Sequence, residues 1–77
     1  MWEIIGYEEK KNVEGIVTGI ELYCTKPFRP GQGEGHKARR VWYRTNEIQY
    51  RPSIGEDVFI ETEVRGKYEI VVDIYMA

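Results

Sequence analysis

Two arginines flank a tryptophan in the segment Arg40-Val41-Trp42-Tyr43-Arg44. Successive side chains of a β-strand point to opposite faces, so the arginines and the tryptophan project together if Val41 and Tyr43 face a core. A flat ring between two positive charges can stack on a base and neutralise phosphates, which is how single-stranded nucleic acid is held. The opposite orientation, with Trp42 in the core and Val41 and Tyr43 outside, is equally compatible with the segment.

A long loop precedes this segment, from Thr25 to His36, with two prolines and three alternating glycines. Loops of this length in small domains are usually functional or disordered. Phe28 could stack on a base while the loop's cations follow phosphates; the alternative is a mobile loop without a ligand. Its glycines do not form a phosphate-binding loop, because no Lys-Ser/Thr pair follows them. The residues predicted to bind nucleic acid are Lys26, Phe28, Arg29, Lys37, Arg39, Arg40, Trp42 and Arg44.

The charges of the chain are segregated. The net charge is −2, but residues 26–51 carry seven Lys and Arg against two Glu, a net +5. Residues 1–25 carry two Lys against five Glu, and residues 52–77 carry two Lys and Arg against six Asp and Glu, so the flanks are acidic. A basic segment of this kind favours an anionic partner over a uniformly solvated surface.

Several classes of function lack the residues they need. No Ser-His-Asp order, acid–base carboxylate pair or metal-ligand cluster is present, so we expect no enzyme, no cofactor and no metal. One cysteine, Cys24, and one histidine, His36, argue against a disulfide framework and a zinc site. The single cysteine and the absence of a signal peptide or long apolar run at the start predict a cytoplasmic protein. Cys24 is expected to be a small buried apolar residue.

Alternating apolar and polar residues predict strands throughout. We expect them over residues 2–7, 13–24, 40–46, 58–64 and 68–76, with at most one helical turn near 46–54. Gly15 and Gly19 share the outer face of the second strand, where they would let a bound strand lie close; barrel curvature is the alternative reason for them. In the last hairpin, a three-residue loop over 65–67, or an equivalent bulge, is needed to bring the apolar faces opposite each other.

Five antiparallel strands in meander order, without covering helices, close most economically into a barrel. The sequence therefore predicts one all-β domain over residues 1–77, a small five-stranded antiparallel barrel of the oligonucleotide-binding (OB) type, with an SH3-like barrel as the alternative.

The segment from Tyr50 to Ile60, and the strand from Lys67 to Asp73, resemble the C-terminal half of the single-stranded DNA-binding proteins of filamentous phages. The shared features are a Tyr-x-Pro link, a strand, a glycine-containing turn and a strand ending in an apolar-Asp pair. The resemblance covers about a third of the chain and implies a dimer that holds DNA with basic and aromatic residues of its strands and loop. The net negative charge of this chain departs from that pattern.

The sequence thus predicts a homodimer that binds single-stranded DNA or RNA with little sequence preference. A protein-interaction module, or an accessory subunit, built around Trp42, Tyr43 and Phe59 is the competing hypothesis.

Overall fold

Five β-strands and no helix make up the computed structural model, which describes all residues from Met1 to Ala77. The strands are β1 (Trp2–Lys11), β2 (Val17–Pro27), β3 (His36–Arg44), β4 (Asp57–Arg65) and β5 (Tyr68–Met76). The predicted all-β class is confirmed. No segment forms a membrane-spanning helix.

The strand order is β3-β2-β1-β4-β5, and each neighbouring pair is antiparallel. The predicted meander order is wrong, because β4 pairs with β1 rather than with β3. A hairpin needs a link of two to five residues, whereas the connection over residues 45–56 is long enough to cross to the far edge of β1. A crossover of this kind is the Greek-key feature of an OB barrel, so the order favours the OB-like alternative over the SH3-like one.

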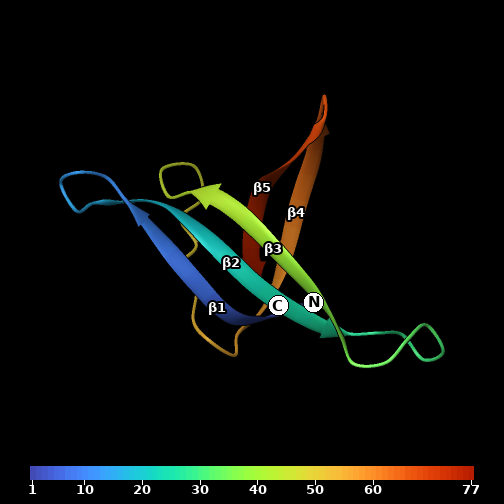
Figure 1. The fold of residues 1–77 in the computed structure, drawn as a ribbon. Coiled ribbons are helices and arrows are strands. Elements are labelled where there is room, and N and C mark those ends of the chain that lie inside the picture. Colours follow the sequence, from blue (N-terminus) through green and yellow to red (C-terminus); the bar gives the residue numbers. More distant parts are fainter.

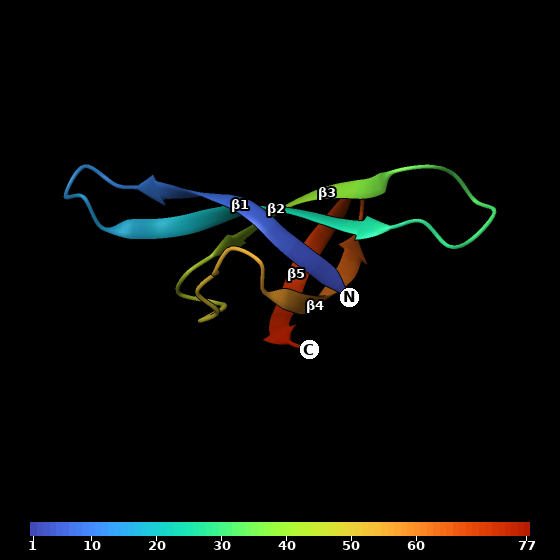
Figure 2. The ribbon, with the colours of Figure 1, turned by 90° about the horizontal axis from the view of Figure 1, so that it is seen from below.

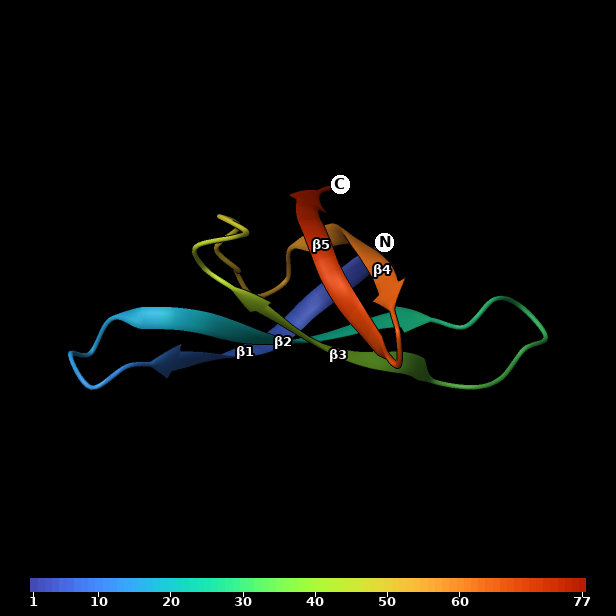
Figure 3. The same ribbon diagram turned by 90° about the horizontal axis from the view of Figure 1, so that it is seen from above.

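The sheet bends so that the β4–β5 hairpin crosses one face of the ribbon formed by β1, β2 and β3 (Figures 1 and 2). The turn after β1 and the loop after β2 extend from opposite ends of this ribbon, as Figure 3 shows from above. The core lies where the hairpin crosses the ribbon. It contains Ile4, Ile20, Leu22, Cys24, Val41, Tyr43, Ile48, Val58 and Ile74.

The barrel is not closed. No backbone pairing joins β3 to β5, so both are edge strands that face each other across a seam. Arg39 Nη2 on β3 lies 2.6 Å from Glu69 Oε1 on β5, and this ion pair spans the seam. The predicted closure therefore fails at one edge, where side chains rather than a ladder connect the strands.

The structure decides between the two orientations that the sequence left open for β3. Val41 and Tyr43 are buried, so the alternative with Trp42 in the core is excluded. Ile48, from the connection after β3, is also buried and was not predicted. The Tyr43 hydroxyl donates a 2.8 Å hydrogen bond to the carbonyl of Tyr50, which fixes this connection against the core.

The last hairpin turns more tightly than predicted. Arg65 pairs with Tyr68, so Gly66 and Lys67 form a two-residue turn and the three-residue loop is wrong. Gly66 has a φ of +60°, as the first central residue of a tight hairpin turn of type II′ requires.

The predicted alternative to a three-residue loop, an equivalent bulge, is present in β5. Thr62 pairs with Val71 and Glu61 with Asp73, which leaves Val72 without a partner. Beyond the bulge Ile60 lies opposite Ile74, so apolar residues again face each other. The bulge also turns Val71 toward the core and leaves Val72 exposed.

Candidate binding surface

Trp42 lies on the outer face of β3 with its indole directly over the backbone of Gly19 on β2. A Cβ atom at position 19 would overlap the ring, so only glycine permits this contact. Gly19 is therefore a point of close approach, but by Trp42 rather than by a ligand. Gly15 lies in the turn after β1 with a φ of +81°, which explains that glycine by conformation. Trp42 remains 44% exposed, so the rest of its ring is open to solvent.

Arg40 and Arg44 flank Trp42 on the same face, as predicted. Their side chains are 70% and 66% exposed. Arg40 Nε lies 3.5 Å from Glu21 Oε1, and Arg44 Nη1 lies 4.0 Å from Glu47 Oε1. Exposed pairs at such distances contribute little to stability, so both guanidinium groups can turn toward an anion at small cost.

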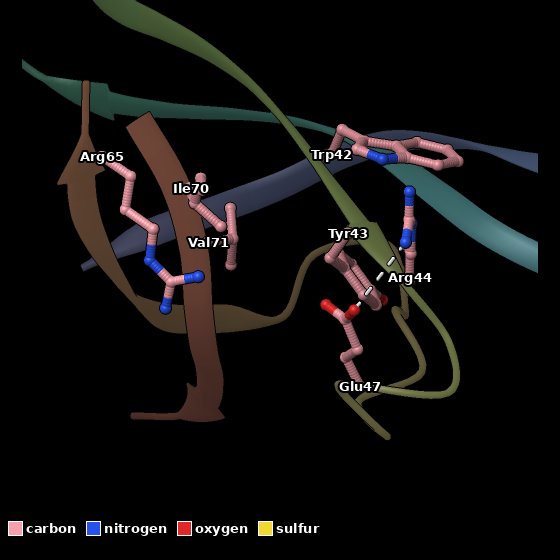
Figure 4. Close-up of a pocket in the computed structure, with 7 residues that line it drawn as sticks. All are labelled: Trp42, Tyr43, Arg44, Glu47, Arg65, Ile70 and Val71. Atoms are coloured by element: carbon pink, nitrogen blue, oxygen red, sulfur yellow. Dashed lines mark ion pairs between the residues drawn. The ribbon is translucent and has the colours of Figure 1, made fainter. Parts of the chain in front are cut away.

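Trp42 forms a ridge between two hollows. One, of about 310 Å³, opens at the seam between β3 and β5 (Figure 4). It is lined by Trp42, Tyr43, Arg44, Glu47, Arg65, Ile70 and Val71. The other, of about 480 Å³, lies toward the start of β2. It is lined by Ile16, Val17, Thr18, Trp42, Arg44, Thr45 and Asn46. A ligand stacked on the exposed face of the ring therefore has room beyond the edges of the indole.

A carboxylate lies within this surface. Glu21 on β2 is directly opposite Trp42 in the β2–β3 register. The Tyr23 hydroxyl donates a 2.8 Å hydrogen bond to Glu21 Oε1, and this bond is the main reason that the pKa of Tyr23 is raised. Sequence reasoning missed Glu21, although its place on the outer face of β2 followed from the alternation.

Three of the predicted cations lie on the opposite, inner face. Lys26 Nζ is 4.5 Å from the centre of the Trp2 ring, and Arg39 Cζ is 5.5 Å from the same ring. Lys37 Nζ is 5.7 Å from the centre of the Phe28 ring. The structure therefore places Lys26, Lys37 and Arg39 on the face opposite Arg40, Trp42 and Arg44.

Phe28 and Arg29 belong to the loop after β2. The Phe28 ring packs on Gly33, where an added Cβ would be 3.4 Å from it, so the loop folds back on itself. Arg29 is exposed. Neither residue lies on the outer face of β3 beside Trp42.

The aromatic rings on the two faces differ in whether a cation already covers them. Cations already lie over Trp2 and Phe28, and each such contact is favourable in itself. No cation lies over Trp42 in this way. The outer face of β3 is therefore the better stacking surface.

The remaining reactive side chains do not form a second site. Cys24 is buried, and desolvation raises the pKa of its thiol, which disfavours the nucleophilic thiolate. No three His, Cys, Asp or Glu side chains gather where they could hold a metal ion.

Comparisons with protein-family models, curated proteins and solved structures returned no match.

Proposed function

We propose that this protein binds single-stranded DNA or RNA, without catalysis, through the outer face of β2 and β3. Trp42 stacks on a base, and Arg40 and Arg44 neutralise the phosphates on either side. Stacking accepts any base, so this mode of binding does not require a particular sequence.

The observation that carries the proposal is the position of Trp42. A large aromatic side chain lies flat on the backbone of Gly19, nearly half exposed, and has an exposed arginine two residues away on each side. Burial in the core does not explain this ring. Its location on a strand rather than a loop holds it in place before a base arrives, which lowers the entropic cost of binding.

The distribution of charge supports the same face. Glu61, Glu63 and Asp73 are exposed on the β4–β5 hairpin, whereas Arg40 and Arg44 are exposed on the outer face of β3. A polyanion is repelled by the hairpin and attracted to the ribbon.

Titration of the protein with a fluorescently labelled single-stranded oligonucleotide of mixed sequence, at 50 and 200 mM salt, tests the proposal. Two or three phosphate contacts should weaken binding roughly 7- to 20-fold over this range. Absence of binding at the lower salt concentration, or binding that salt does not change, would contradict it.

A second candidate function is protein binding, favoured by one specific pair. Phe59 and Tyr75 are both more than 40% exposed, and their ring centres are 5.5 Å apart on the β4–β5 hairpin. We propose that this pair lies in the interface of a symmetric homodimer, because exposed aromatic clusters are typical of interfaces. We propose in addition that the protein is cytoplasmic. Val71, on the same hairpin, packs on the core and is not part of this pair's surface. A monomer in sedimentation at high micromolar concentration would contradict the dimer.

A further inference from the structure

Glu21 occupies an unusual position for a carboxylate. Its side chain is 22% exposed and lies in the middle of the outer face, between Trp42 on β3 and Glu8 on β1. Like charges directly opposite each other on neighbouring strands destabilise a sheet. Arg40 offsets the charge of Glu21, and Lys10, whose Nζ lies 2.5 Å from Glu8 Oε1, offsets that of Glu8.

The two oxygens of Glu21 have different surroundings. Oε1 accepts the hydrogen bond from Tyr23, which orients the carboxylate, and lies 3.5 Å from Arg40 Nε. No hydrogen bond within the protein engages Oε2. Glu21 therefore presents one oxygen on the surface that can accept a further hydrogen bond.

Glu21 and the indole of Trp42 lie on the same face of the sheet. The indole covers Gly19, and Glu21 is two residues further along the same face of β2, about 7 Å away. A base that stacks on the indole has its edge beside this carboxylate. Only a hydrogen-bond donor on that edge can pair with it.

We propose that Glu21 gives this surface a preference for bases with an exocyclic amino group, namely cytosine, adenine and guanine, over thymine and uracil. The proposal rests on the nucleic-acid binding inferred above. It adds a preference among bases to stacking, which by itself accepts any base. An amino group donates to Glu21 Oε2, as carboxylates accept from the amino group of cytosine. Thymine and uracil lack this amino group, and their one donor on that edge, N3–H, is flanked by two carbonyl oxygens that a carboxylate repels.

Two oligonucleotides of the same length, one of thymidine and one of 5-methyl-deoxycytidine, isolate this chemistry. Their bases share the methyl group and nearly the same shape, and at position 4 one carries a carbonyl where the other carries an amino group. The wild-type protein should bind the 5-methyl-deoxycytidine strand at least about fivefold more tightly. Glu21→Gln should abolish the preference, because a carboxamide both donates and accepts.

Glu8→Gln is the matched control, since it removes the same charge from the residue directly opposite Glu21. It should strengthen binding of both strands equally and keep their ratio. Equal binding of the two strands by the wild-type protein would overturn the role of Glu21 and leave the stacking surface intact. A ratio that Glu21→Gln and Glu8→Gln change equally would also overturn it. Failure of the folded wild-type protein to bind either strand would overturn the proposed function and this preference with it.

Discussion

The indole of Trp42 covers the backbone of Gly19, and the absence of a side chain at position 19 is what makes that contact possible. One residue creates the flat surface, and the other supports it from the neighbouring strand. The cross-strand register places Gly19 opposite Arg44 and Glu21 opposite Trp42, so the indole leans diagonally from its own position over Gly19. The orientation of the ring is therefore set by the β2–β3 pairing.

Gly19→Ala should displace the indole and weaken oligonucleotide binding about as much as removal of the ring. The added methyl group overlaps the ring, and a surface side chain can swing away more easily than the strands can separate. Trp42→Ala and Gly19→Ala should then be non-additive, which a double-mutant cycle of binding free energies measures. Additive effects would show that Gly19 does not position Trp42.

Arg40 and Arg39 are adjacent in sequence but lie on opposite faces, and their alanine variants should differ. Arg40→Ala should flatten the dependence of affinity on salt by about one phosphate contact, because it removes a cation beside Trp42. Arg39→Ala should leave the slope near that of the wild type, because this side chain pairs with Glu69 on the inner face. Equal changes in slope for the two variants would place the nucleic acid elsewhere.

The loop over residues 29–36 should exchange its amide hydrogens far faster than β4. Only a few backbone hydrogen bonds hold it, such as that from the Gln32 amide to the Arg29 carbonyl, and Phe28 is its one aromatic anchor. Hydrogen-exchange mass spectrometry of the free protein measures this directly. Protection equal to that of Val58 to Val64 would reject a flexible loop.

Alkaline pH should destabilise the protein through Tyr43. Burial raises the pKa of its phenol from 10.0 to about 12. The neutral phenol is therefore favoured in the folded state, and its contribution to stability is complete below pH 10 and is lost as the pH rises toward 12. Tyr43→Phe should cost about 1 kcal/mol at neutral pH through the lost hydrogen bond to Tyr50. In this variant the free energy of unfolding should fall less steeply between pH 10 and 12; an unchanged slope in denaturant titrations would contradict this.

The period-two pattern of the sequence was enough to predict five strands. It also showed that Val41 and Tyr43 share one face of β3, but not which face is buried, because the residue between them is the aromatic Trp42. The same alternation could have placed Arg39 and Arg40 on opposite faces, yet the predicted site combined them. The contact of Lys26 with the ring of Trp2 was not predicted, although Trp2 lies on the same face of β1 as the buried Ile4.

Other features depend on register and topology, which no short segment encodes. The contact of Trp42 with Gly19 requires the pairing of β2 with β3; the glycine indicated a close approach but not the group that approaches. The bulge at Val72 reverses two side chains in a strand whose pattern continues without interruption. The crossover after β3 was not predicted. Burial of Ile48 depends on where this connection packs, which the short segment itself does not show.

Replacement of Trp42 tests the account most directly. The measurement is the affinity of a labelled single-stranded oligonucleotide for wild-type protein and for Trp42→Ala at two salt concentrations, with folding checked by circular dichroism. Because Trp42 lies outside the core, the variant should fold, and its affinity should fall by roughly 1–3 kcal/mol, the usual contribution of one stacked base. The loss should be the same at both salt concentrations, since stacking releases no counterions. A folded Trp42→Ala protein that binds as tightly as the wild type would contradict the proposed stacking surface.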